Sequence, residues 1–330
     1  MRNINNDLIY IMRKLKLYAL VKCGYDCFFR WDERRVNKSF GVENDDVRFL
    51  IIRPAGKITG LLGIFLHALD VMAEYDEQIE PLIDLKNYDN QFMGIDCGDE
   101  SLEGNPWDLF FKQPSLYRLS DAYKSSNVTI DGWTIDELWC NHNIVLRNSD
   151  MQNILQEYNS VLQKHPITVS DYINKLSKPY VEKYIDDRTL GVFTRGTDYV
   201  STKPYQHFVQ PTAAQQIPPI INMVERYNLS RIFLVTEDCR IREELEEASP
   251  VPIYCIEQPE FKAYDYSSRS YVNDLITDKR VTNENYLIKC VCLSKCNYIV
   301  SSIASGSIFA NLIKGESYID SIYLNLGKYT

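Results

Sequence analysis

The C-terminal half of this chain alternates short apolar runs with helical segments, and this alternation most constrains the fold. Five runs have the length and composition of buried strands: Thr189–Thr194, Arg231–Val235, Val251–Ile256, Asn297–Ser301 and Tyr318–Tyr323. Segments with helical spacing lie between them, near residues 219–228, 239–248, 284–296 and 306–314. This order predicts an α/β fold with a parallel, doubly wound sheet. We expect Pro218 and Pro219 to start the first of these helices, because proline is tolerated best in a first turn.

The N-terminal half contains one further strand–helix–strand unit. Val47–Arg53 and Pro81–Leu85 are the predicted strands, and Gly60–Tyr75 is the helix between them. A short aromatic helix is expected within Asn105–Pro114, and a capping box at Ser149-x-x-Gln152 opens another helix. Two more short helices follow, to about residue 185. We place a domain boundary near residue 180, which gives two Rossmann-like domains, 1–180 and 181–330, that face a cleft.

Composition narrows the classes of partner. A formal net charge of −9 and a pI near 5.1 argue against nucleic acid, whose binding proteins usually carry a basic face. The nine cysteines form no regular framework, and a chain of 330 residues needs no disulfides to fold. We therefore expect reduced thiols in a cytoplasmic protein. Cys290, Cys292 and Cys296 allow a zinc interpretation, but buried apolar packing is favoured, because no second pair follows at ligand spacing.

The basic N-terminal segment allows two interpretations. Within residues 7–22, apolar side chains recur at helical spacing and basic ones fill much of the other face. Such a helix either lies on an anionic membrane surface or covers the protein's own core, and the second is the commoner use. Neither a signal-peptide pattern nor a run long enough to span a bilayer is present. A peripheral contact with the inner membrane face therefore stays an alternative.

Polar side chains gather where three predicted strands end. These stretches are FTRGTD (193–198), TED (236–238) and SSIASGS (301–307), which runs into a helix. Ligands of open parallel sheets bind beyond the carboxyl ends of the strands. Arg195 suits a phosphate, Glu237 and Asp238 suit ribose hydroxyls or a base, and the helix start offers N–H donors. The competing interpretation is that Arg195 pairs with Asp198 and that the other side chains cap helices.

Three longer stretches contain these residues in order: GVFTRGTDYVSTKPYQHFVQPT, IFLVTEDCRIREEL and LSKCNYIVSSIASGSIFANLI. Together with NPWDLFFKQP, they resemble the fucosyltransferase superfamily with an HxRxxD motif, especially its bacterial members associated with surface polysaccharides. The resemblance covers most of residues 47–330. It implies a GT-B fold with an N-terminal acceptor-side domain and a C-terminal donor domain. It further implies inverting, metal-independent transfer of fucose from GDP-fucose to a hydroxyl of a glycan or lipid-linked oligosaccharide.

The resemblance also implies roles for single residues. Arg195 matches the arginine that holds the donor β-phosphate, and Asp198 matches the aspartate of the same motif. The full set expected at the donor is Phe193, Arg195, Gly196, Asp198, Thr236, Glu237, Asp238, Ser305, Gly306 and Ser307. His207 and Glu237 are the candidates for a general base, and no metal or other cofactor is expected. Because Phe193 stands where the family has histidine, the alternative is a non-catalytic member that binds a nucleotide sugar or glycan, or acts as a scaffold.

Overall fold

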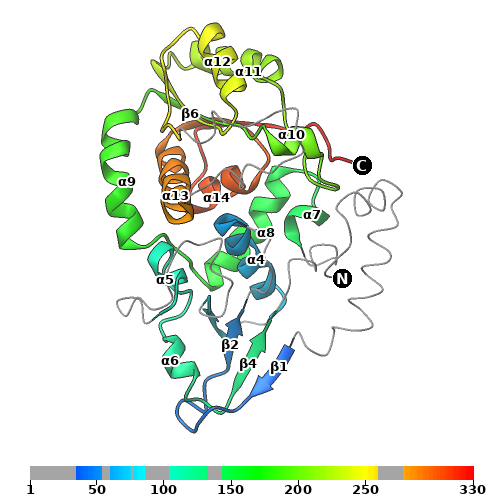
Figure 1. Ribbon diagram of the computed structural model, residues 1–330, viewed down its shortest axis with the longest axis vertical. Coiled ribbons are helices and arrows are strands. Elements are labelled where there is room, and N and C mark those ends of the chain that lie inside the picture. The colour runs from blue at the N-terminus through cyan, green and yellow to red at the C-terminus, as the bar shows by residue number, and fades with distance from the viewer. Residues whose placement is uncertain (1–34, 54–59, 76–77, 86–103, 133–142, 259–277) are drawn as a thin grey trace.

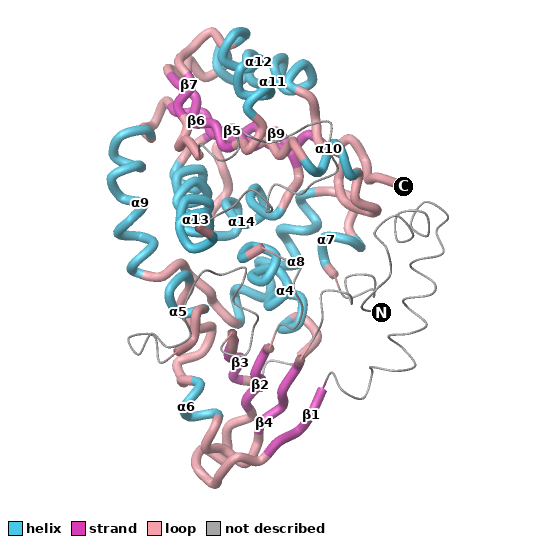
Figure 2. The backbone as a smooth tube through the Cα atoms, in the orientation of Figure 1, coloured by secondary structure: helices cyan, strands magenta, loops and turns pink. Residues whose placement is uncertain are grey.

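The computed structural model describes residues 35–53, 60–75, 78–85, 104–132, 143–258 and 278–330. Two sheets lie at opposite ends of this part of the chain, with helices between them (Figures 1 and 2). The N-terminal sheet has the order β1-β4-β2-β3 and the C-terminal sheet the order β7-β6-β5-β8-β9. The expected α/β class is thus confirmed. The segment 7–22 lies outside the described residues.

The C-terminal sheet is parallel throughout. Its strands are β5 (Thr189–Phe193), β6 (Arg231–Val235), β7 (Ile253–Tyr254), β8 (Tyr298–Ser302) and β9 (Asp320–Leu324). Its order is 3-2-1-4-5 in chain sequence, which is that of a doubly wound sheet. Burial explains why these strands could be predicted from the sequence. Every side chain of β5 is buried, and strands covered on both faces appear in a sequence as apolar runs.

Helices cover both faces of this sheet. On one face lie α11 (Ala213–Arg226) and α12 (Cys239–Ala248), and Leu190 and Val192 of β5 pack against them. On the other face lie α13 (Lys279–Lys295) and α14 (Ser305–Lys314), which Phe193 contacts. Gly191 also faces that layer, where an added Cβ would lie 3.1 Å from Leu293 Cδ2.

The N-terminal sheet is mixed. The strands β2 (Phe49–Ile52), β3 (Glu80–Ile83) and β4 (Val128–Asp131) are parallel, while β1 (Arg35–Lys38) pairs antiparallel with β4. The helix α4 (Leu61–Met72) packs on one face, and α6 (Leu119–Ala122) contributes to the apolar cluster on the other. The strand β4 and its edge partner β1 were not predicted, because β1 exposes three of its four residues and only the first and last residues of β4 are buried, the last being Asp131.

One apolar core joins the two units. Phe309 of α14 packs edge-to-face on Phe65 of α4, with ring centroids 4.8 Å apart, and at 5.9 Å from Phe111. Residues of β2, α4, α8 (Met151–Lys164) and α13 belong to the same cluster. In Figure 1 the layer of α13 and α14 accordingly lies between the two sheets. The domain boundary near residue 180 stays a prediction, and that position falls within a helix.

Three expectations about helices were wrong. Asp150, not Ser149, caps α8, with its Oδ1 2.9 Å from the amide of Asn153. A single helix, α9 (Asp171–Tyr184), replaces the two short ones, because its packing on α13 outweighs the cost of its internal proline. The helix α11 begins at Ala213 rather than at the prolines, since Thr212 and Gln215 form a capping box one turn earlier.

Three short helices complete the described chain. The predicted aromatic helix is α5 (Trp107–Phe110), whose Trp107 is fully buried. The others are α7 (Ile144–Arg147) and α10 (Asp198–Thr202). Buried Asp70 of α4 holds α7 by accepting from the amide of Ile144, and it also accepts from the Tyr158 hydroxyl at 3.0 Å.

Candidate functional site

The three polar strand ends meet at the centre of the C-terminal sheet. The strands β5 and β8 are neighbours there, and the helices that follow them lie on opposite faces. This is the topological switch point of the sheet, where ligands of doubly wound folds bind. Residues 193–198 follow β5 and residues 301–307 include the end of β8, while residues 236–238 follow β6 on the other side of β5.

Arg195 lies at the middle of this edge and is held on three sides. Its Nη2 lies 3.4 Å from Asp198 Oδ1, and its Nε lies 3.4 Å from Glu237 Oε1. The guanidinium carbon stands 4.1 Å from the centre of the Tyr199 ring, a cation–π distance. The backbone amide of Arg195 donates to Ser302 Oγ at 3.4 Å. The side chain is still 22% exposed, so one side of it remains open to a ligand.

Burial and neighbouring charges set the protonation of this pair. Burial lowers the pKa of Arg195, but Glu237, Tyr199 and Asp198 together raise it above its ordinary value. Burial also raises the pKa of Glu237, and nearby Asp198 adds to this, against the lowering effect of Arg195. The guanidinium is therefore always charged, whereas the Glu237 carboxyl holds its proton more tightly than an ordinary glutamate does. A carboxyl whose pKa is raised in this way suits proton transfer.

Thr197 takes a backbone conformation that side chains rarely adopt, with φ 46° and ψ −116°. Its amide donates to Asp238 Oδ2 at 3.1 Å. Its hydroxyl lies 2.9 Å from Glu237 Oε1 and 3.2 Å from Asp198 Oδ1, and its one proton can serve only one of them at a time. Backbone strain of this kind costs on the order of 1–3 kcal/mol and persists only where the surroundings impose it.

Three residues of the predicted donor set have structural roles here. Asp238 is 1% exposed and caps α12, with Oδ1 accepting from the amides of Arg240 and Ile241. The Thr236 hydroxyl accepts from the amide of Asp238 at 3.0 Å. Gly196 packs directly on Asp238, because an added Cβ would lie 2.5 Å from Asp238 Oδ2 and 2.6 Å from its Cβ. These residues hold the Arg195 loop in place.

The two serines that follow the third strand end, Ser305 and Ser307, also differ in their roles. Ser307 is fully buried, accepts from the amide of Ala304 at 3.1 Å and donates to the carbonyl of Ser302 at 2.7 Å. Ser305 is half-buried, and its hydroxyl has no hydrogen-bond partner among the described residues. Of the two serines, only Ser305 can therefore offer its hydroxyl to a ligand without breaking an internal contact.

Phe193 forms the apolar floor of the site. Its side chain is 2% exposed and lies against the start of α14, where a Cβ on Gly306 would come within 2.5 Å of its Cε2. The same Cβ would meet the hydroxyl of Tyr286, from α13. Glycine at position 306 thus lets a β5 side chain and an α13 side chain approach the start of α14 together.

His207 lies one ring away from the guanidinium. Its ring packs edge-on against Tyr199 with centroids 5.3 Å apart, and the Tyr199 ring also contacts the Arg195 guanidinium. The C-terminal tail holds this loop, because the amide of Gln206 donates to the Tyr329 carbonyl and Tyr329 donates to the His207 carbonyl, each at 2.9 Å. Lys328 of the same tail donates to the carbonyls that end α7. The structure thus places His207 near the site but not against Arg195.

Three residues beside the site were not in the predicted donor set. Ser302 and Tyr199 lie within the stretches SSIASGS and GVFTRGTDYVSTKPYQHFVQPT, so the sequence indicated their surroundings. Tyr286 belongs to α13 and precedes the third recognised stretch, which begins at Leu293. The packing of α13 against α14 brings Tyr286 to the site, and no spacing in the sequence gives that contact.

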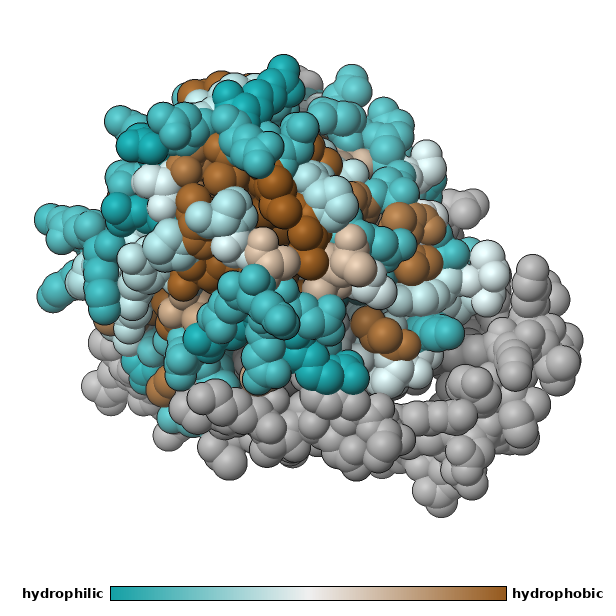
Figure 3. Space-filling view, turned by 90° about the horizontal axis from the view of Figure 1, so that it is seen from above, coloured by the Kyte–Doolittle hydropathy of each residue, from teal (hydrophilic) through white to brown (hydrophobic). Residues whose placement is uncertain are grey.

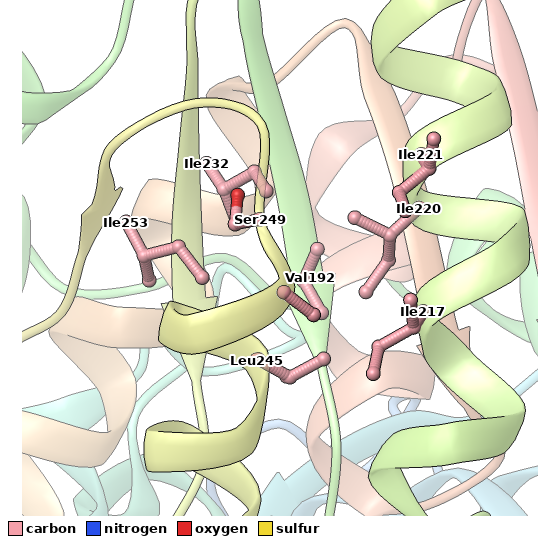
Figure 4. Close-up of a pocket in the computed structure, with 9 residues that line it drawn as sticks. Val192, Ile217, Ile220, Ile221, Ile232, Leu245, Ser249 and Ile253 are labelled. Atoms are coloured by element: carbon pink, nitrogen blue, oxygen red, sulfur yellow. The ribbon is translucent and has the colours of Figure 1, made fainter.

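A small cavity lies elsewhere, between the sheet and the α11–α12 layer. In the view from above, apolar side chains show between polar ones (Figure 3). Figure 4 shows isoleucines of α11 facing Val192 and Leu245 across this gap. Its volume is about 10 Å³, and its lining is almost wholly apolar. A space of that size holds at most one water, and an apolar one stays empty. It is a packing gap, not a ligand site.

The described residues hold no set of three or more His, Cys, Asp or Glu side chains placed to bind a metal ion. Cys290, Cys292 and Cys296 are fully buried free thiols. Cys290 Sγ donates to the Gly306 carbonyl, and Cys296 Sγ donates to the Cys292 carbonyl. In the same part of the chain, every helix is too short or too polar to cross a bilayer.

Comparison with protein-family models and with curated proteins finds no match for this sequence. Similar solved structures include a NodZ α-1,6-fucosyltransferase soaked with GDP-fucose, with 11% identity, a TM-score of 0.41, and coverage of 81% of this chain and 92% of that chain. The fucosyltransferase NodZ from Bradyrhizobium shows 13% identity and a TM-score of 0.41, with coverage of 81% of this chain and 93% of that chain. POFUT1 in complex with GDP-fucose shows 9% identity and a TM-score of 0.44, with coverage of 85% of this chain and 98% of that chain. Likeness at this level does not decide an activity.

Proposed function

We propose that this chain is a glycosyltransferase that uses a nucleoside diphosphate sugar as its donor. The observation that carries the proposal is the place of Arg195, a charged and partly exposed guanidinium at the switch point of a doubly wound sheet. As the bond between sugar and diphosphate breaks, negative charge grows on the leaving group. A fixed guanidinium beside the start of a ten-residue helix stabilises that charge without reorganising.

The sequence motifs support a finer version of the proposal. The resemblance of residues 191–212, 232–245 and 293–313 to the HxRxxD fucosyltransferases favours GDP-fucose as the donor and a glycan hydroxyl as the acceptor. A lipid-linked acceptor at the inner membrane face would suit the basic segment 7–22. Glu237 is the better general base of the two candidates, because burial raises its pKa and it lies next to Arg195, whereas His207 stands behind Tyr199.

A second candidate function is binding without turnover. Two observations favour it. Phe193 presents a ring without hydrogen-bonding groups where the family has histidine, and Arg195 already faces two carboxylates of its own chain, Asp198 and Glu237. A protein of this kind would bind a nucleotide sugar or glycan, or act as a scaffold.

Thermal unfolding in the presence of nucleotides tests the binding step. The unaltered protein is scanned with GDP, GDP-fucose, GDP-mannose, UDP and ADP, with and without magnesium. A ligand at a hundred times its Kd stabilises the fold by about 2.7 kcal/mol. We expect a guanine-selective, magnesium-independent shift that Arg195→Ala removes. Arg188→Ala is the matched control, because that exposed arginine stands at the opposite end of β5. No shift with any nucleotide overturns the proposal.

Release of GDP from GDP-fucose then separates the two candidates. With a glycan acceptor present, the transferase hypothesis expects turnover in the unaltered protein, and such turnover excludes the non-catalytic alternative. If GDP binds but no acceptor of a glycan panel supports release, Phe193→His is assayed in the same way. Turnover that appears only in Phe193→His would assign the unaltered chain to the non-catalytic class.

A further inference from the structure

The helix α13 lies along the candidate site and turns one face toward it. Tyr286, Lys289 and Cys290 are spaced i, i+3 and i+4, so they share a side of the helix. The Cys290 thiol donates to the Gly306 carbonyl, and the Tyr286 hydroxyl lies against the Gly306 Cα. Lys289 is buried on this side of the helix, and its ammonium donates to Gln258 Oε1. The sequence motifs include none of these three residues.

The Tyr286 hydroxyl is available to a ligand. Its side chain is half-buried, and no described residue forms a hydrogen bond with its hydroxyl. The hydroxyl is not among the buried polar atoms that lack a partner, so it is accessible to solvent or to a ligand. Burial raises the pKa of Tyr286 well above its ordinary value, nearby Cys290 adds to this, and Arg195 opposes it. The group is therefore a neutral O–H donor at physiological pH.

Arg195 is a second side chain at this edge of the sheet with an unsatisfied donor, which is itself buried. Its Nε forms no hydrogen bond within the described residues, although it lies 3.4 Å from Glu237 Oε1. The start of α14 links the two side chains, because the Tyr286 hydroxyl lies beside Gly306 and the amide of Arg195 donates to Ser302 Oγ, three residues before the helix begins. Phe193, which packs beside the Tyr286 hydroxyl at Gly306, contributes no polar group. The Tyr286 hydroxyl of α13 therefore lies beside the Phe193 ring, which has no hydroxyl of its own.

We propose that Tyr286 is a binding residue for the donor, and that its hydroxyl donates a hydrogen bond to a phosphoryl oxygen of the nucleoside diphosphate that Arg195 binds. The inference rests on the proposed function and adds a contact to it. It assigns to an α13 side chain a donor role that Phe193 cannot perform from β5.

Isothermal titration of Tyr286→Phe with GDP tests this contact. Removing a hydrogen bond to a charged group should weaken binding roughly tenfold or more. The variant without ligand should unfold at the same temperature as the unaltered protein, because the hydroxyl has no internal partner to lose. Tyr227→Phe is the control. Its hydroxyl bonds Asp320 at 2.9 Å, at the start of β9, so its loss should leave the affinity for GDP unchanged.

Titration with guanosine identifies the contacted part of the ligand. A phosphoryl contact predicts equal guanosine affinity in the unaltered protein and in Tyr286→Phe. Equal weakening for guanosine and GDP would overturn the phosphoryl assignment. Unchanged GDP affinity in Tyr286→Phe, with binding lost in Arg195→Ala, would overturn the inference and leave the proposed function standing. If the unaltered protein binds no nucleoside diphosphate, the inference and the proposed function are overturned together.

Discussion

Replacing Asp238 by alanine should destabilise the folded protein even without any ligand, because this side chain has two structural roles. Its Oδ1 caps α12 by accepting from the amides of Arg240 and Ile241 at 3.0 and 3.3 Å. Its Oδ2 accepts from the amide of Thr197, a buried residue in a strained conformation. Both contacts lie within the Arg195 loop and its neighbour, so the site and the local fold should fail together.

The size of the effect follows from the two contacts. Loss of an N-cap costs about 1 kcal/mol. A buried amide left without an acceptor costs a further 1–3 kcal/mol or so. The sum is roughly 2–4 kcal/mol. For a domain of 150–250 residues each kcal/mol lowers Tm by about 2–4 °C, so Asp238→Ala should unfold roughly 4–16 °C below the unaltered protein.

Differential scanning calorimetry without nucleotide measures this shift, and Asp278→Ala provides the matched control. Asp278 caps α13 through a single contact with the amide of Val281, at an exposed position. Its loss should cost only the capping energy, about 1 kcal/mol. A Tm of Asp238→Ala no lower than that of Asp278→Ala would refute the reasoning. Asp238 would then be free to act on a ligand, as the sequence predicted.

Two further predictions concern protonation and thiol reactivity. Burial, helped by Asp84 and opposed by Arg53, raises the pKa of Tyr123 to about 12. The folded state therefore holds this proton more tightly than the unfolded state, so stability should fall as the pH rises from about 10 to 12. Tyr123→Phe should flatten that part of the pH profile in urea unfolding, and an unchanged slope would contradict the assignment. Burial likewise raises the pKa of Cys292 to about 12, so a maleimide at pH 8 should label Cys292 only after unfolding. Labelling of the folded protein, read by peptide mass, would show that α13 opens.

The central strands of the C-terminal sheet could be predicted because burial on both faces leaves a plain signal. Val192 and Leu234 face one helical layer, while Phe193 and Phe233 face the other. Between their two ends, β5 and β6 contain only apolar residues and Gly191. The polar stretches after Phe193 and Val235 therefore indicated where the strands end and which residues are candidates for the site. The same pattern predicted both the fold and the site.

The elements that escaped prediction depend on contacts between distant parts of the chain. The strand β1 has a single strand partner and mostly exposed side chains, so its four residues carry no apolar pattern. The α9 helix continues through Pro179 because α13 lies beside it, and neither segment predicts the other. Tyr286 reaches the site by the same route, across a helix–helix contact.

The donor set was only partly readable for a different reason. Motif residues of the same chemical type have different roles in the structure. Asp198 lies against the guanidinium, whereas Asp238 caps a helix and holds a strained amide. Ser305 exposes its hydroxyl and Ser307 buries it. A carboxylate or hydroxyl at a strand end is equally suited to a ligand and to a helix start, since both offer the same N–H and O–H partners.

An arginine that already faces two carboxylates can still bind an anion if those contacts are weak. The distances from Arg195 to Asp198 and to Glu237 are both 3.4 Å, longer than the 2.7–2.9 Å of a strong charge-assisted hydrogen bond. A phosphoryl oxygen at bonding distance would therefore replace two loose contacts with a tight one. The carboxylates hold the guanidinium in position over Tyr199 until the ligand arrives, so little of the ligand's binding energy is spent on ordering the side chain.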